Sequence, residues 1–526
     1  MISIQANRTS RIYLACTLAI WLGVNAVYIG WEAKPPFVDV FLFKEAGVNL
    51  ALEGKFVAAN LPHMPPEVPL LYAYYAPVYP FLYGAWTAVT GVGLKQSILF
   101  DHLIKGARTL LLFLFITPWL IPRLNDKEPK ALTILGALLC LSFLPYYNDR
   151  PDELAIVFGL LSWWLLSGPK PFGGRFTLSG ICLGVCAATS PAASILFGLG
   201  SLFYFLKNRQ SPRVKGLRVL AVIVSFSLCF LPVFVIDHGA WSRFSAQLPL
   251  SVLPYQGFPS GFAWLRRFGG NWISTFWFAG KFALLPFLLF FSVVRGLWPK
   301  IKGTPTAKQF HPYVLATAIY APLATIVWSQ QPRYLWFPCI TAFLLLSDVW
   351  LNVSSPQAKE PSPGVFLGLK QNWLVYAVLT LAIVPGLLRE GHFILEAFEA
   401  PDGQSSRQVR ERVLSYIASS ARLAVPADQF FTFRSVKEVA MAYYVCPWLD
   451  RFDYVYLTPG LEARDAHVPL LPPCREQRRC FSAVKDFRDP TEFTVLGFRT
   501  SHLIRSNAGV LFKNTKCLGK LHAQNT

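Results

Sequence analysis

The chain has 526 residues, of which 53% are hydrophobic and only 15% are charged, and its mean hydropathy is +0.40. Soluble domains carry about 25% charged residues, so the composition argues against a soluble protein and predicts a polytopic α-helical membrane protein. The net charge of +20 would favour binding to nucleic acid. No zinc finger, basic helix or other nucleic-acid module accompanies it, so a nucleic-acid partner is not expected.

The first apolar run extends from Ile12 to Trp31 and follows Arg8 and Arg11. It lacks a small-residue cleavage site, so we expect a retained signal anchor whose N-terminus is cytoplasmic. Further apolar runs of roughly 15 to 23 residues follow and give about eleven crossings. They lie at about 99–121, 131–145, 152–168, 176–190, 191–206, 217–236, 274–295, 312–329, 333–352 and 373–388. The pair around Thr189–Ser194 could instead form a re-entrant hairpin.

Lysine and arginine concentrate in alternate loops, as expected for cytoplasmic loops. They lie in 123–130, 170–175, 207–218 and 295–308. The aromatic segment 78–93 must then not cross, because a crossing there would invert every later loop. We expect it to be an interfacial helix on the outer surface.

This topology gives the outer face the loop 32–98, the turn 146–152 and the loop 237–273. The polar region 390–526 lies on the same face, and its helical and strand-like runs predict a small α/β domain beside a membrane domain of residues 1–389. Its cysteines are expected to form two disulfides, with Cys474–Cys480 and Cys446–Cys517 preferred among three connectivities. Four unpaired thiols are the alternative. The other cysteines fall inside predicted spans.

Asp39 lies just after the first span, where an ionised group is costly to keep and is therefore a functional candidate. Glu45 follows in a predicted amphipathic helix, Val40–Glu53, that ends at Gly54. Asp39 could alternatively serve only as the N-cap of that helix. The outer loop also carries the aromatic residues Tyr75 and Tyr79.

The turn YNDRPDELA adds a second group of acids at the outer face: Asp149, Asp152 and Glu153. Asp152 and Glu153 could be a helix-start signal, since they follow Pro151. Four charged residues within five positions exceed what a cap requires. A carboxylate pair facing Asp39 would let one acid act as a base while another orients an acceptor.

Basic residues on the outer face are candidates for binding a lipid phosphate. Arg333 opens a late span in QQPRYLWFP and could bind phosphate bidentately, or could extend toward the headgroups with Tyr334 in an aromatic belt. Arg266, Arg267 and Lys281 lie in or beside the loop 237–273, and Lys105 and Arg108 are weaker candidates.

No Walker loop, dinucleotide fingerprint, HExxH or GxSxG pattern is present. The outer-face carboxylates could hold a divalent ion, but they lack the spacing of a metal site, and no metal ligand is assigned.

In their order, these motifs resemble the GT-C superfamily of integral membrane glycosyltransferases, and especially the protein O-mannosyltransferase and aminoarabinose transferase groups. The matching phrases are DVFLFKEAGVNLALEGKF, YAYYAPVYPFLYG, RPDELA and RYLWFP, followed by a soluble tail. The resemblance covers about the first 390 residues. Val40 replaces a second acid that many relatives carry, and the YYAPVYP run lacks the basic residue found in aminoarabinose transferases.

The resemblance implies transfer of a sugar from a polyprenyl-phosphate donor to an acceptor glycan, lipid or protein at the periplasmic face of a bacterial inner membrane. Asp39 would be the catalytic acid of the first outer loop and Arg333 the arginine of the donor side. An inverting displacement is expected. The alternatives are a transporter or flippase, an oligosaccharide polymerase or ligase, and a non-catalytic assembly subunit.

Overall fold

The structure is a computed structural model. It describes residues 7–30, 40–58, 70–71, 77–143, 151–167, 174–207, 211–231 and 312–320, together with parts of 337–347 and of 395–515. The chain forms two compact units. The first contains Met1–Leu22, Leu103–Tyr146 and Pro151–Leu388, and the second contains Gly23–His102, Tyr147–Arg150 and Arg389–Thr526.

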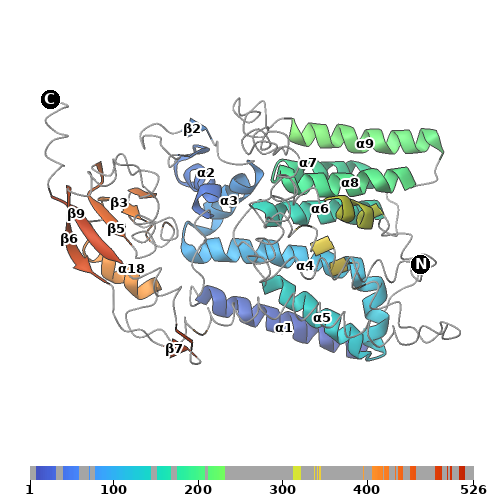
Figure 1. The fold of residues 1–526 in the computed structure, drawn as a ribbon, viewed down its shortest axis with the longest axis horizontal. Helices are drawn as coiled ribbons and strands as arrows, with labels where there is room; N and C mark the ends of the chain where they lie inside the picture. The colour runs from blue at the N-terminus through green and yellow to red at the C-terminus, as the bar shows by residue number, and fades with distance from the viewer. Residues whose placement is uncertain are drawn as a thin grey trace, which may run out of the picture. The chain divides into compact units, whose positions relative to one another are not determined.

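The first unit is helical, and its helices match the predicted apolar runs along the chain (Figure 1). α1 and α4 contribute residues to both units. The helices are α1 (Arg8–Gly30), α4 (Leu94–Asn125), α5 (Pro129–Phe143), α6 (Pro151–Ser167), α7 (Arg175–Ala187), α8 (Pro191–Lys207) and α9 (Pro212–Phe230), and residues 312–320 are also helical.

Proline fixes where several of these helices begin. α5, α6, α8 and α9 each start at a proline, whose fixed φ suits the first helical position and whose missing N–H has no intrahelical partner there. These starts are therefore encoded locally.

The core of the first unit is built around Trp163 on α6. Its indole N–H donates to the carbonyl of Phe197 over 2.9 Å, and its ring stacks on Tyr313 with 4.3 Å between centroids.

α7 approaches α9 closely because Gly180 and Gly184 carry no side chain. A Cβ there would lie 2.5 Å from the carbonyl oxygen of Val222 and 2.7 Å from that of Phe226. Such close approach through small residues is typical of helix packing in membranes.

Among the described residues, α1 alone combines the length and the apolar composition needed to cross a bilayer, while α5, α7 and α8 are apolar but shorter. The number of crossings and their orientation stay predictions.

In the second unit, α2 (Val40–Glu53) is the helix predicted after Asp39, and Gly54 follows it with φ of +69°. α3 (Val78–Thr90) is the helix expected in the segment 78–93. The two pack closely, since a Cβ on Gly47 would lie 2.1 Å from the carbonyl oxygen of Pro80. Short strands β1 (Val57–Ala58) and β2 (Leu70–Leu71) pair antiparallel between them in the chain.

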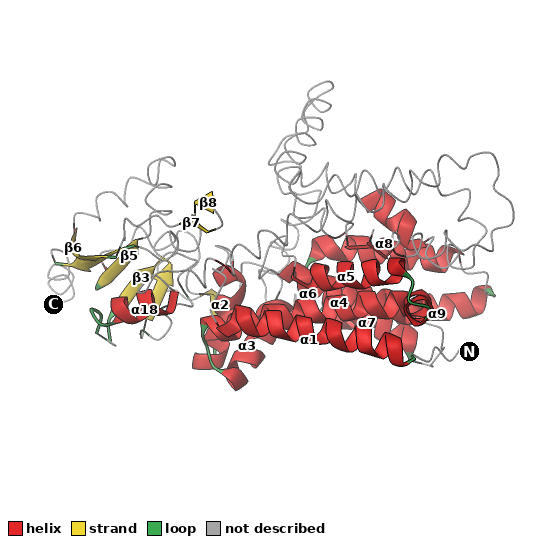
Figure 2. Ribbon diagram, turned by 90° about the horizontal axis from the view of Figure 1, so that it is seen from below, coloured by secondary structure: helices red, strands yellow, loops and turns green. Residues whose placement is uncertain are grey.

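The C-terminal region contains a short helix and several β-strands (Figure 2). The helix predicted over 411–423 overlaps α18 (Ser406–Leu414) only at its start, because Arg422 already begins a strand. A five-stranded sheet has the order β4-β3-β5-β9-β6, in which β4, β3 and β5 are parallel and β9 is antiparallel to both of its neighbours. The elements are α18 (Ser406–Leu414), β3 (Arg422–Val425), β4 (Glu438–Met441), β5 (Tyr454–Leu457), β6 (Phe481–Asp486) and β9 (Val510–Asn514), with a separate hairpin of β7 (Thr494–Val495) and β8 (Phe498–Arg499).

The cysteines of the described residues divide as expected. Cys16, Cys140, Cys182, Cys186 and Cys229 are free thiols in helices. Cys480 is disulfide-bonded. The preferred disulfide connectivity stays a prediction, because Cys446, Cys474 and Cys517 lie outside the described residues. The proposed domain boundary at residue 390 also lies outside them and stays a prediction.

Candidate functional site

The structure describes some of the predicted site residues. Glu45, Tyr79, Asp152 and Glu153 are all buried. The others lie outside the described residues, namely Asp39, Asp149, Tyr75, Arg266, Arg267, Lys281, Arg333 and Tyr334. The site can therefore be described only at the helices that carry Glu45, Tyr79, Asp152 and Glu153.

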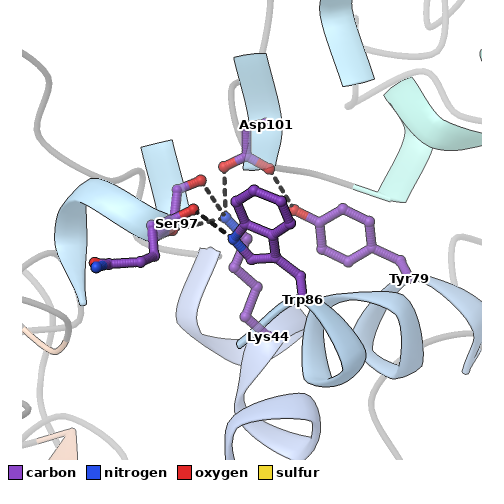
Figure 3. Close-up of polar contacts among 6 residues, drawn as sticks. Lys44, Tyr79, Trp86, Ser97 and Asp101 are labelled. Carbon is purple, nitrogen blue, oxygen red and sulfur yellow. Dashed lines mark hydrogen bonds and ion pairs between the residues drawn. The ribbon is translucent and has the colours of Figure 1, made fainter. Parts of the chain in front are cut away.

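A buried ion pair joins α2 to α4 in the second unit (Figure 3). Lys44 on α2 lies with its Nζ 2.5 Å from Oδ2 of Asp101 on α4, and the same Nζ donates to the hydroxyl of Ser97 over 2.7 Å. Tyr79 on α3 donates its hydroxyl proton to Oδ1 of Asp101 over 2.7 Å. We call Lys44, Tyr79, Ser97 and Asp101 the Asp101 cluster. It ties three helices together at one carboxylate.

Aromatic side chains lie beside this cluster. The Lys44 ammonium lies 4.8 Å from the ring centroid of Tyr83, a cation–π distance, and Trp86 on α3 donates its indole N–H to the carbonyl of Gln96 over 3.0 Å. Lys44 is fully buried and Asp101 is only 4% exposed. Charges so deeply buried are tolerated only when paired and hydrogen-bonded, so the position of Lys44 depends on Asp101.

The next residue of α4, His102, contacts α1 instead. Its Nδ1 is hydrogen-bonded to Oδ1 of Asn25, and its ring lies 5.1 Å from that of Tyr28. With Oδ1 of Asn25 as the acceptor, Nδ1 of His102 is the donor in this contact. All three side chains are buried. The consecutive residues Asp101 and His102 thus contact different helices: Asp101 contacts α2 and α3, and His102 contacts α1.

A second buried ion pair lies in the first unit. Arg108 on α4 donates from Nη1 to Oε2 of Glu153 on α6 over 2.6 Å, and from Nη2 to the carbonyl of Leu141 on α5. Arg108 is fully buried. Its guanidinium, predicted as a weak phosphate candidate, therefore binds α5 and α6 to α4.

Asp152, the neighbour of Glu153, accepts a hydrogen bond at Oδ1 from the hydroxyl of Ser190 over 2.7 Å. Ser190 follows α7 and precedes α8. The contact fixes the orientation of the Asp152 carboxylate. A role for Asp152 or Glu153 in binding or catalysis stays a prediction.

Within the described residues, no three histidine, cysteine, aspartate or glutamate side chains gather closely enough to hold a metal ion. The predicted alternative of a divalent ion would depend on Asp39 and Asp149, which lie outside them.

Sequence reasoning did not single out Lys44, Ser97, Asp101, His102 or Asn25. A signal was available, because ionisable residues within apolar helices are costly and need a partner. From sequence alone, the charged residues of α4 are placed at the outer end of a span. Their contacts with other helices cannot be predicted, since Lys44 and Asp101 are 57 residues apart and one sequence does not show that they meet.

No model of a known protein family matches this sequence, and no curated protein is similar to it in sequence. Solved structures are similar in fold. ArnT from Cupriavidus metallidurans in the apo state is 14% identical, covers 96% of this chain and 98% of its own length, and gives a TM-score of 0.53. The same enzyme bound to undecaprenyl phosphate is also 14% identical, over 96% of this chain and 97% of its own, with a TM-score of 0.56.

The oligosaccharyltransferase AglB from Archaeoglobus fulgidus, in complex with an inhibitory peptide and a dolichol-phosphate, is 10% identical over 95% of this chain and 74% of its own. Its TM-score is 0.45, too low to support an argument. ArnT is an aminoarabinose transferase of the GT-C superfamily. The resemblance stated from the motifs is therefore confirmed at the level of fold, and this chain has the fold of ArnT.

Proposed function

We propose that this chain is a membrane glycosyltransferase that moves a sugar from a polyprenyl-phosphate donor to an acceptor. One observation carries the proposal. The fold matches ArnT over nearly the full length of both chains, and one of the two matched ArnT structures is bound to undecaprenyl phosphate. A lipid-phosphate donor also suits a protein with 53% hydrophobic residues.

In the proposed reaction Asp39 is the general base. It accepts the proton of the acceptor hydroxyl as that oxygen bonds to the anomeric carbon of the sugar. The bond from the anomeric carbon to the phosphate oxygen breaks, and the polyprenyl phosphate leaves with the electron pair. Because attack and departure occur on opposite faces, the anomeric configuration inverts.

The other predicted residues divide between donor and acceptor. Arg333, with Arg266, Arg267 and Lys281, would stabilise the negative charge of the leaving phosphate. Asp149 and Asp152 would orient the acceptor, and the fixed carboxylate of Asp152 suits that task. The predicted contacts to substrate are Glu45, Glu153, Tyr75, Tyr79 and Tyr334. Of these, Tyr79 and Glu153 also bond within the protein, to Asp101 and Arg108.

The proposal is tested by sugar transfer from a panel of radiolabelled polyprenyl-phosphate sugars, using the purified protein in lipid. We expect Asp39→Asn to lower kcat by about 100- to 10,000-fold, the contribution of a positioned general base. The matched control is Glu53→Gln, which makes the same acid-to-amide change at the exposed C-terminal end of α2 and should leave kcat unchanged.

Two outcomes would contradict different parts of the proposal. Folded wild-type protein that consumes no donor would overturn the glycosyltransferase assignment. Transfer that persists at the wild-type rate in Asp39→Asn would leave the enzyme class standing and remove Asp39 as its base.

We further propose an integral protein of the bacterial inner membrane with a cytoplasmic N-terminus and a periplasmic C-terminal domain. The disulfide at Cys480 supports an oxidising compartment for that domain. The cysteines of α1, α5, α7 and α9 are free, as expected within spans.

Labelling of thiols tests this orientation. Cys480→Ser should release its disulfide partner as a thiol that reacts with a membrane-impermeant maleimide added outside spheroplasts. Wild-type protein should show no such labelling of the C-terminal domain, which is measured by mass spectrometry of its peptides. If the released thiol reacts only after lysis, the C-terminal domain is cytoplasmic.

A further inference from the structure

The consecutive residues Asp101 and His102 hold the two helices that flank the Asp39 segment. α1 ends at Gly30, and α2 begins at Val40. His102 binds Asn25 and contacts Tyr28 near the end of α1. Asp101 binds Lys44 in the first turns of α2. Both attachments lie within the second unit.

Helix geometry explains how neighbouring residues can serve two partners. Successive side chains on an α-helix point about 100° apart, so adjacent positions face different elements. Their Cα atoms are nevertheless only about 3.8 Å apart. The end of α1 and the start of α2 are therefore attached to α4 at neighbouring positions.

The chemistry of the contacts favours positioning over stability. A buried ion pair is often no more stabilising than apolar residues of the same volume. Its directional bonds fix the rotation and the translation of a helix, which apolar contacts leave freer. Lys44 has two hydrogen-bond partners on α4 and Asp101 also accepts from Tyr79 on α3, so α2 is held in one register.

The close packing of α2 on α3 completes this arrangement. Gly47 lies against the backbone of Pro80 and Gly84, leaving no room for a side chain. α2 is thus fixed on one side by backbone contact and on another by the ion pair.

We propose that Asp101 and His102 are positioning residues that set the separation and orientation of the end of α1 and the start of α2, the two helices between which Asp39 lies in the chain. The proposal rests on the proposed function in taking Asp39 as the base. A displacement of about 1 Å at a reacting group can cost about a hundredfold in rate, so a positioning device of this kind would be visible in kcat.

The test uses one variant for each attachment. His102→Leu removes the hydrogen bond to Asn25. The double variant Lys44→Met/Asp101→Leu removes the ion pair without stranding a charge. We expect each to lower kcat by about tenfold to a hundredfold while changing KM for the donor little, the pattern of lost transition-state alignment. His102→Asn keeps a donor near the Nδ1 position and should restore much of the rate.

Leu112→Ala is the matched control for destabilisation. Leu112 is fully buried on α4 but belongs to the core of the first unit. Its truncation is expected to cost about as much stability as other large-to-small core changes while leaving kcat unchanged. A kcat that falls in proportion to thermal stability across all variants, this control included, would overturn the proposal.

Hydrogen–deuterium exchange gives a readout that does not require activity. Amides of α2 should exchange faster in the double variant, and amides at the end of α1 should exchange faster in His102→Leu, than in wild type; both should exchange at the wild-type rate in Leu112→Ala. Unchanged exchange would refute positioning even in an active enzyme. Faster exchange in a protein that consumes no donor would uphold the positioning of α1 and α2 and refute only the proposed function.

Discussion

Asp101→Leu is expected to destabilise the protein by about 3–5 kcal/mol, the usual cost of removing one partner of a buried ion pair. The substitution would leave the fully buried ammonium of Lys44 without its carboxylate and the hydroxyl of Tyr79 without its acceptor. Unfolding of the purified protein in mixed micelles, followed by tryptophan fluorescence, measures the loss.

The double variant Lys44→Met/Asp101→Leu separates the cost of a stranded charge from the loss of a contact. With both charges removed, most of the lost stability should return, because no buried charge remains unpaired, although the hydroxyl of Tyr79 still lacks its acceptor. The kcat of the same variant should stay low, as argued for the positioning of α2. An Asp101→Leu protein as stable as wild type would show that Lys44 is not buried as described.

Arg108→Met is expected to have a comparable effect in the first unit, again about 3–5 kcal/mol. Glu153 would keep a buried carboxylate without its guanidinium, and the carbonyl of Leu141 would lose its donor. The same unfolding measurement applies.

The matched control for this prediction lies on the same helix. Arg123 pairs with Glu128 at 3.1 Å, but the two side chains are 18% and 37% exposed. Arg123→Met should therefore cost only about 0–1 kcal/mol. Equal losses in Arg108→Met and Arg123→Met would mean that burial does not decide the strength of these pairs.

The double variant Arg108→Met/Glu153→Leu also tests the predicted substrate role of Glu153. Stability should largely recover, for the reason given for Lys44 and Asp101. Normal sugar transfer by a stable double variant would make Glu153 a structural residue, whereas a stable but inactive one would support its predicted contact with substrate.

The local features of this fold were predictable from residue patterns. Proline marks the first residue of α5, α6, α8 and α9, and Gly54 follows α2 where the sequence predicted the helix to end. The strand-like run around Tyr454–Leu457 forms β5. These signals act within a few residues, so a single sequence contains them. The GT-C resemblance was also carried by short motifs, and the fold comparison confirms it.

The partners of the buried charges could not be predicted in the same way. The substrate contacts predicted for Tyr79 and Glu153 stay predictions, and the structure shows that each also has a partner inside the protein. Lys44 meets Asp101 across 57 residues, and Arg108 meets Glu153 across 45. Such pairs depend on which faces of two helices meet, and no local pattern encodes that choice.

The sequence by itself determined the membrane character predicted for this protein, the positions of its helices and the acids to be considered for catalysis, because composition, periodicity and helix-end residues are local properties. Only the tertiary structure decided which of the described charges are used internally. Burial makes an ionised side chain costly unless a partner lies within hydrogen-bonding distance, and that partner is supplied by another helix. The pairing of Asp101 with Lys44 and of His102 with Asn25 is thus a property of the packed helices.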